Sequence, residues 1–346
     1  MKPKFYILIY LWLSYISLFS QGKIMEERFL PIGDIDQWIT INGDNIKNPV
    51  ILFIHGGPGS TLSHYKDDVF RDWTKKFTIV HWDQRGAGKT FGKNAPNEIN
   101  EEFYLNHPLE VEEMTKDGIE LSQYLTKYLN KRKIIIVGTS WGSILATKMV
   151  LKQPELFHAY VGHAQFVNFK DNIAYAYTKV LEMALKNEEQ QTIEKLESIG
   201  NPPYDRAQSY GQLLRVIKKY EIETATKAPA TWGKIAQSYD NNKDSKDRYN
   251  GDDYSFLNLV GDKLIGVSSM VSAIDFRENG FIFQLPIIII QGEKDILTPK
   301  ELNKPYFEKI RAPRKEYYIV QNAAHGFNQT MINKLYDVII NLRVQD

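Results

Sequence analysis

The chain has 346 residues, 43% of them hydrophobic, and carries 43 Lys and Arg against 42 Asp and Glu, which gives a formal net charge of +1. This near-neutral balance provides no electrostatic basis for binding nucleic acid or an anionic membrane surface. The absence of cysteine excludes disulfides, thiolate metal sites and a cysteine nucleophile. The length suits one large domain with an insertion, or two domains.

The chain begins with the pattern of a secretory signal. Lys2 and Lys4 precede the apolar run "FYILIYLWLSYISLF", and small or polar residues follow, so that cleavage is expected after Ser20 or Gly22. The run is shorter than the roughly 20 residues that a membrane-spanning helix needs. We therefore expect residues 1–22 to direct export to the periplasm or the medium, with no stable membrane insertion after cleavage. The alternative is an uncleaved N-terminal membrane anchor.

Six short segments rich in Val, Ile, Phe and Tyr predict the strands of a mainly parallel sheet. In chain order they are "VILFIHGGPG", "FTIVHWDQRG", "IIIVGTSWG", "AYVGHAQ", "IIIIQGEKD" and "YYIVQNAAH". Continuous rather than alternating apolar runs indicate strands that are buried on both faces. Helical patterns such as "VEEMTKDGIELSQYLTKYLN" and "SILATKMVLKQ" lie between them. This alternation predicts an α/β fold with helices on both faces of the sheet.

The alternation of strand and helix stops between residues 166 and 279. Helical patterns occupy "DNIAYAYTKVLEMALKN", "SYGQLLRVIKKYEI" and "SFLNLVGDKLIGVSSMVSAI", and the polar run "DNNKDSKDRYNGDD" is interpreted as a flexible loop. The simplest account is a helical insertion between two halves of one sheet. We predict that residues 166–279 form a cap over a core made of residues 23–165 and 280–346.

Ser140 lies in the pentapeptide Gly138-Thr139-Ser140-Trp141-Gly142, directly after a predicted strand and before a predicted helix. In that context a G-x-S-x-G motif mounts a nucleophilic serine on a tight turn, where a side chain at either glycine would clash. The pentapeptide by itself is equally consistent with a serine that caps a helix. A serine hydroxyl is a weak nucleophile, so the first interpretation requires a histidine base and a carboxylate.

Two later strand ends supply such partners. Asp295 follows "IIIIQGEK" and His325 follows "YYIVQNAA", which is the order of serine, acid and histidine in α/β-hydrolases. We therefore predict Ser140 as the nucleophile, His325 as its base and Asp295 as the acid that orients the imidazole, with an acyl-enzyme intermediate. His55 precedes Ser140, the wrong order for this fold, and is expected to hold loops by hydrogen bonds.

Acyl transfer also requires two backbone N–H donors for the oxyanion. One is expected from Trp141, which follows the nucleophile, and the other from Gly57 in the "HGGPG" loop, because Pro58 has no N–H. No spacing among the histidines and carboxylates resembles a metal site, so neither a metal nor another cofactor is expected. A serine at position 140 also argues against dehalogenases and epoxide hydrolases of this fold, which need a carboxylate there.

Together, "HGGPG", "DQRGAGKT", "GTSWGS", "DILTP" and the final histidine resemble the prolyl aminopeptidase (proline iminopeptidase) group of α/β-hydrolases. The resemblance covers residues 30–165 and 280–346. It implies an α/β-hydrolase core with a helical cap, and release of an N-terminal residue, often proline, from small peptides. It also implies that Asp83 and Arg85 fix the loop beside the site.

The sequence departs from this group where the substrate's amine would bind. Several members carry a Glu directly after the triad acid, and here that position is Ile296. The resemblance places other amine-binding carboxylates in the cap, where the candidates are Glu182, Glu221, Glu223 and Asp240. An esterase, lactonase or amidase acting on a small acyl substrate is therefore the alternative to a peptidase. A non-catalytic binding protein that keeps the fold is the alternative from a different class.

Overall fold

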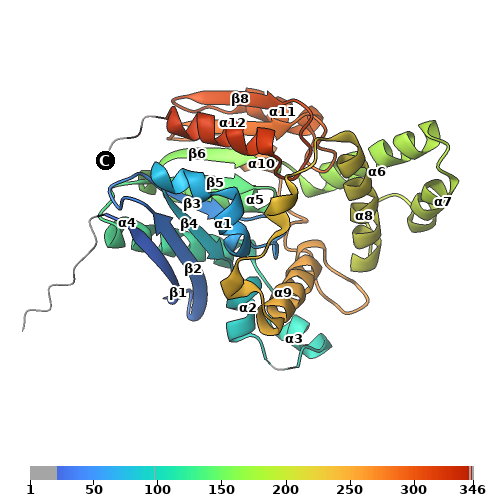
Figure 1. The fold of residues 1–346 in the computed structure, drawn as a ribbon. Coiled ribbons are helices and arrows are strands. Elements are labelled where there is room, and N and C mark those ends of the chain that lie inside the picture. The colour runs from blue at the N-terminus through green and yellow to red at the C-terminus, as the bar shows by residue number, and fades with distance from the viewer. Residues whose placement is uncertain (1–21, 97, 343, 345–346) are drawn as a thin grey trace, which may run out of the picture.

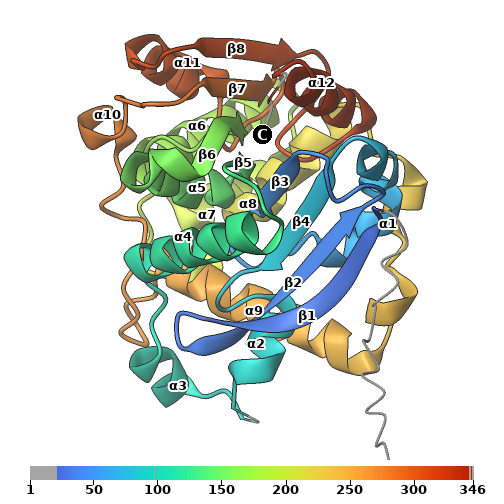
Figure 2. The same cartoon turned by 90° about the vertical axis from the view of Figure 1, so that its left-hand side faces the viewer.

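The computed structural model describes residues 22–96, 98–342 and 344, so nearly all of the predicted signal segment lies outside the described residues. An eight-stranded sheet forms the centre of the molecule (Figures 1 and 2). Its strand order is β1-β2-β4-β3-β5-β6-β7-β8. The strands are β1 (Ile24–Ile32), β2 (Ile35–Gly43), β3 (Val50–Ile54), β4 (Thr78–Asp83), β5 (Ile134–Thr139), β6 (Phe157–His163), β7 (Ile287–Gly292) and β8 (Lys315–Val320).

The predicted parallel strands are present, and an N-terminal hairpin that the apolar runs did not predict extends the sheet. β3 to β8 pair in parallel, whereas β1 pairs antiparallel with β2, and β2 antiparallel with β4. β1 is an edge strand with several exposed or half-buried residues. A sequence such as "IMEERFLPI" therefore lacks the continuous apolar run by which buried strands are recognised.

Helices cover both faces of the sheet (Figure 1). Along β5, Ile134 and Ile136 pack into one core cluster and Ile135 and Val137 into the other, because successive side chains point to opposite faces. The first cluster includes side chains of α4, α5 and α11, and the second those of α12. The core helices are α1 (Lys66–Val69), α2 (Gly88–Asn94), α3 (Glu101–Asn106), α4 (Val111–Tyr128), α5 (Trp141–Lys152), α11 (Lys300–Lys309) and α12 (Gln329–Ile340).

The chain between β6 and β7 is helical, and α6, α7 and α8 stand beyond one end of the sheet (Figure 1). Side chains of α6 and α8 such as Val180 and Leu213 continue the first core cluster into this region. The helices of this span are α6 (Phe169–Lys186), α7 (Gln190–Ile199), α8 (Ala207–Thr224), α9 (Asn242–Val260) and α10 (Phe276–Asn279).

The interpretation of the polar run as a loop is wrong, because these residues form most of α9. The side chain of Asn241 caps the helix by accepting from the N–H of Asp244, at 2.9 Å. The face that α9 buries is largely polar or small, so the sequence shows no apolar periodicity there. The helix predicted from residues 255 to 274 also ends early, at Val260, where Gly261 has a φ of 75°.

Candidate active site

Ser140 lies on a tight turn between β5 and α5. Its φ of 52° and ψ of −122° are unfavourable for a residue with a side chain, so the surrounding structure must hold the strain. A Cβ on Gly142 would collide with the carbonyl oxygen of Ile54, and a Cβ on Gly138 would lie 2.7 Å from the carbonyl oxygen of Gly142. Both glycines of the pentapeptide are therefore required by close backbone contacts at this turn.

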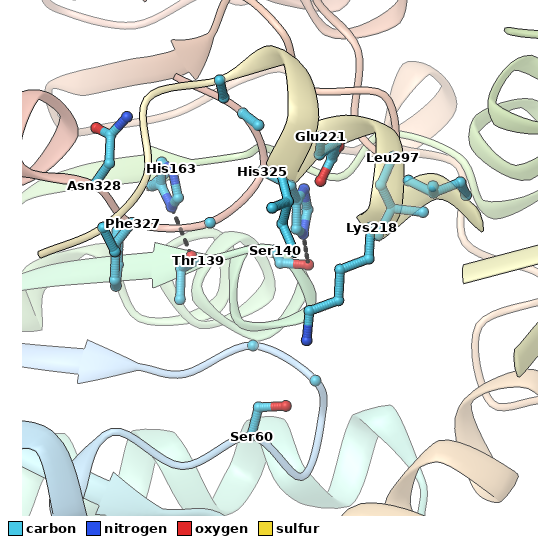
Figure 3. Close-up of a pocket in the computed structure, with 18 of the residues that line it drawn as sticks. Ser60, Thr139, Ser140, His163, Lys218, Glu221, Leu297, His325, Phe327 and Asn328 are labelled. Atoms are coloured by element: carbon cyan, nitrogen blue, oxygen red, sulfur yellow. Dashed lines mark hydrogen bonds between the residues drawn. The ribbon is translucent and has the colours of Figure 1, made fainter. Parts of the chain in front are cut away.

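The structure brings Asp295 and His325 to this serine from two other strand ends. Asp295 follows β7, and His325 lies in the loop between β8 and α12. The Nε2 atom of His325 is 2.8 Å from the Ser140 hydroxyl, and its Nδ1 atom is 3.1 Å from both carboxylate oxygens of Asp295. Figure 3 shows the resulting contact between His325 and Ser140. The three predicted residues thus form one hydrogen-bonded chain.

Asp295 is held as a carboxylate although its side chain is fully buried. Burial alone would raise its pKa, but His325 and the Thr298 donors outweigh this effect and keep the pKa below its ordinary value. The Thr298 N–H donates to one carboxylate oxygen at 2.8 Å, and its hydroxyl donates to the other at 2.7 Å. Gln291 adds a third donor at 2.9 Å. This carboxylate can therefore fix the orientation of the imidazole.

The "HGGPG" loop and the start of α5 lie on either side of the serine. A Cβ on Gly56 would be 3.2 Å from that of Ser140, so the loop passes directly beside the hydroxyl. Gly57 lines the same pocket. Trp141 is the first residue of α5, and its N–H therefore has no acceptor within the helix. Of the two predicted oxyanion donors, Gly57 thus lies at the pocket and Trp141 directly follows Ser140.

The "DQRG" segment is held by hydrogen bonds to several other elements. Arg85 pairs with the buried Asp117 of α4 through two hydrogen bonds, at 2.9 and 3.2 Å. Asp83 accepts from the Ser63 hydroxyl at 2.6 Å. His55, as expected, serves the loops: its carbonyl accepts from the side chain of Gln84 at 3.0 Å, and its Nδ1 lies 2.8 Å from the carbonyl oxygen of Gly56.

Ser140 lines a pocket with a volume of about 710 Å³. A pocket of this size suits a small ligand. Its floor comes from the strand ends that carry Ser140, His163 and His325, and its walls come from α8 and α9. The apolar part of the lining consists mainly of Leu62, Leu214, Ile217, Ile222, Phe256, Leu297 and Phe327.

Two carboxylates from the inserted helices also line the pocket. Glu221 of α8 is 8% exposed, and its Oε1 atom accepts from the N–H of Ile296 at 2.7 Å. Asp252 of α9 accepts from the Ser60 hydroxyl at 3.2 Å. The other three cap candidates do not line the pocket. The sequence gives no signal for Asp252, because this residue lies in the polar run whose composition predicts a loop.

Within the part of the chain that the structure describes, no group of three or more His, Asp or Glu side chains is arranged to hold a metal ion. None of the helices in the same residues combines the length and the apolar character needed to cross a membrane.

Comparison with known proteins agrees with this architecture. The profile of the α/β hydrolase fold family matches residues 49–328. The probable aminopeptidase YbaC of Bacillus subtilis is 29% identical over 319 residues, which cover 87% of this chain and 90% of that protein. A proline iminopeptidase of Neisseria meningitidis is 23% identical over 342 residues, covering 90% and 94% of the two chains.

Solved structures show the same fold. The proline iminopeptidase of Mycobacterium smegmatis superimposes with a TM-score of 0.62 at 15% identity and covers 91% of this chain and 97% of its own. VinJ gives a TM-score of 0.60 at 18% identity, with the same coverage of the two chains. The profile match extends over most of the sequence, from β3 to the loop that carries His325. The chain therefore belongs to the α/β hydrolase fold family and resembles the prolyl aminopeptidases within it.

Proposed function

We propose that this hydrolase is a serine aminopeptidase that releases N-terminal residues, proline among them, from small peptides. The observation that carries the proposal is the hydrogen-bonded chain from Asp295 through His325 to Ser140 at the floor of the pocket. The names of the Bacillus and Neisseria relatives support the peptidase assignment over other acyl transfers.

In the proposed reaction His325 Nε2 takes the hydroxyl proton while Ser140 Oγ bonds to the carbonyl carbon of the scissile amide. The N–H groups of Gly57 and Trp141 stabilise the oxyanion. When the C–N bond breaks, His325 returns the proton to the leaving amine. Water, deprotonated by His325, then attacks the acyl-enzyme, which releases the carboxylic acid and restores the Ser140 hydroxyl.

The pocket carboxylates support recognition of a free N-terminal amine. Ile296 stands where several prolyl aminopeptidases carry a Glu, yet Glu221 brings a carboxylate from α8 to the backbone of that same residue. Asp252 adds a second carboxylate on the opposite wall, beside Ser60. An ammonium group binds most strongly to a carboxylate that is partly shielded from water, as Glu221 is. Glu221, the more buried of the two, is the proposed amine site.

The Ser140→Ala variant tests the chemistry. It is expected to lose turnover by several orders of magnitude while its circular dichroism spectrum and melting temperature stay unchanged, because the hydroxyl is the only group removed. A fluorophosphonate probe should label the wild type and leave the variant unlabelled. Labelling of both proteins, or turnover by the variant, would contradict the proposal and favour a protein without serine catalysis.

An esterase, lactonase or amidase remains the second candidate, because the pocket lining is mainly apolar apart from the charged groups described. The two functions separate when kcat/KM on proline p-nitroanilide is compared with that on a short-chain p-nitrophenyl ester. Replacement of Glu221 by Gln should reduce turnover of the anilide, which carries a free amine, far more than that of the ester. Equal losses on both substrates would favour the esterase.

Export through residues 1–22 is part of the same proposal, on the strength of the basic, apolar and small residues in that order. Cell fractionation followed by sequencing of the mature N-terminus provides the test. A mature chain that begins after Ser20 or Gly22 would support cleavage. A full-length chain in the membrane fraction would favour the anchor instead.

A further inference from the structure

The pocket-facing side of α8 carries charges of both signs. Leu214, Ile217, Lys218, Glu221 and Ile222 all line the pocket, and their spacing of three or four residues places them on one face of the helix. Figure 3 shows the Lys218 side chain extending from α8 into the space in front of Ser140, toward the wall that carries Ser60. A cation and a buried carboxylate therefore face the same cavity from adjacent turns of one helix.

Lys218 has no carboxylate partner within 4.0 Å among the described residues, although its neighbours on α8 do find partners. Lys219 pairs with Glu189 at 2.6 Å, on the side of α8 away from the pocket. One carboxylate oxygen of Glu221, Oε1, accepts from the backbone N–H of Ile296 at 2.7 Å. The positive charge of Lys218 acts to lower the pKa of Asp252 across the pocket, although the two side chains form no ion pair. The Lys218 ammonium is thus available to an anion in the cavity.

We infer that Lys218 binds the C-terminal carboxylate of the substrate, so that the enzyme selects dipeptides. The inference rests on the proposed aminopeptidase function, in which Glu221, one turn further along α8, holds the amine. A dipeptide carries its ammonium on one side of the scissile bond and its carboxylate on the other. Side chains three residues apart on a helix have Cβ atoms roughly 5–6 Å apart, a spacing that brackets one peptide unit.

Longer peptides do not satisfy this arrangement. Each added residue moves the terminal carboxylate by up to about 3.3–3.6 Å along an extended chain, away from the position where Lys218 stands one helical turn from Glu221. Lys218 then contacts only neutral backbone. Lysine suits the task because its ammonium is a compact charge on a flexible stem, with three hydrogens to donate to a carboxylate.

The test compares L-prolyl-L-alanine with its C-terminal amide, which differs only in lacking the carboxylate. In Lys218→Met, which keeps most of the stem, kcat/KM on the dipeptide is expected to fall about tenfold, mainly through KM, the scale of one charge-assisted hydrogen bond. The kcat/KM of this variant on the amide should stay within about twofold of the wild-type value, a change no larger than the loss of an exposed charge produces. Lys218→Arg should restore much of the preference for the dipeptide.

Lys219→Met is the matched control, because it removes a cation from the next position of α8 that does not line the pocket. It should leave both substrates unchanged. If the ratio of kcat/KM on the dipeptide to kcat/KM on the amide is the same in the wild type and in Lys218→Met, this inference alone is overturned. The same conclusion follows if replacing Lys227, the other lysine that lines the pocket, changes that ratio and replacing Lys218 does not. Failure of the wild type to hydrolyse either substrate would overturn the proposed function, and this inference with it.

Discussion

At the scale of single residues, the ionisation of His325 is governed by two carboxylates. Burial lowers its pKa, but Asp295 and, to a smaller extent, Glu221 outweigh that effect and raise the pKa to about 9. The imidazolium form therefore predominates below this pH. Because a general base must be neutral, kcat/KM is expected to fall as the pH drops below the pKa of His325.

Replacing Glu221 by Gln removes one of these negative charges, so the pKa of His325 should fall and the acid limb of the kcat/KM profile should move to lower pH. The profile is best measured with p-nitrophenyl acetate, which has no amine to bind Glu221. Glu223→Gln, on the same helix but outside the pocket lining, is the control and should leave the limb in place. An unmoved limb in Glu221→Gln would show that this carboxylate does not act on His325.

At the scale of secondary-structure elements, the position of Ser140 depends on how closely α5 approaches β3. A Cβ added to Gly142 would collide with the carbonyl oxygen of Ile54 and lie 2.6 Å from that of His55, and this backbone at the end of β3 cannot rotate away. The Ser143 N–H and hydroxyl both bond to the Ser140 carbonyl, at 2.8 and 2.6 Å. These contacts fix the first turn of α5 against the sheet.

Gly142→Ala should therefore displace α5 and weaken the contact between Ser140 and His325. We expect a loss of about 1–3 kcal/mol in the free energy of unfolding, as for other overpacked sites. A fall in kcat of up to about a hundredfold is also expected, because a shift near 1 Å at a reacting group has that effect. Urea denaturation and steady-state kinetics measure the two.

The comparison variant is Gly233→Ala, because an added Cβ there meets no atom within 4 Å and the backbone has no positive φ. It should change neither quantity. A Gly142→Ala protein with wild-type kinetics would show that α5 can move without disturbing the serine.

At the scale of the whole molecule, the inserted helices are joined to the core by a polar contact between α2 and α9. Lys89 pairs with the buried carboxylate of Asp244 at 2.6 Å, and Trp38 of β2 donates to the Tyr239 hydroxyl at 2.8 Å. The ammonium of Lys89 also lies over the rings of Trp38 and Tyr239. This contact fixes α9, the helix that carries Asp252, at the wall of the pocket.

Lys89→Ala should weaken the contact between α2 and α9, because it leaves the Asp244 carboxylate buried without its cation. The expected loss in the free energy of unfolding is about 1–3 kcal/mol. Amides of α9 are expected to exchange hydrogen faster, and KM for peptide substrates should rise. Lys243→Ala is the control on the same helix: the Lys243 side chain is largely exposed, so its pair with Asp247 contributes about 0.5 kcal/mol or less. Equal exchange in the two variants would show that the Lys89 contact does not hold the cap.

The strands and the three candidate catalytic residues were predictable because each has a local signature. Runs such as Ile134–Val137 are apolar on both faces, and the carboxyl ends of parallel strands meet at one edge of the sheet, so residues that follow different strands become neighbours. The edge strand β1 lacks that signature, since one of its faces is largely exposed. The helix α9 lacks it as well, because it buries polar residues such as Asn258 that bond across to the core.

Local patterns in the sequence are therefore enough to predict the α/β hydrolase fold, the turn that carries Ser140 and the order in which Asp295 and His325 follow it. They do not predict which charged side chains between β6 and β7 reach the pocket. Glu221, Asp252 and Lys218 look like ordinary solvated helix charges in the sequence. Their positions depend on how α8 and α9 pack against segments far away along the chain, and no local periodicity encodes that packing.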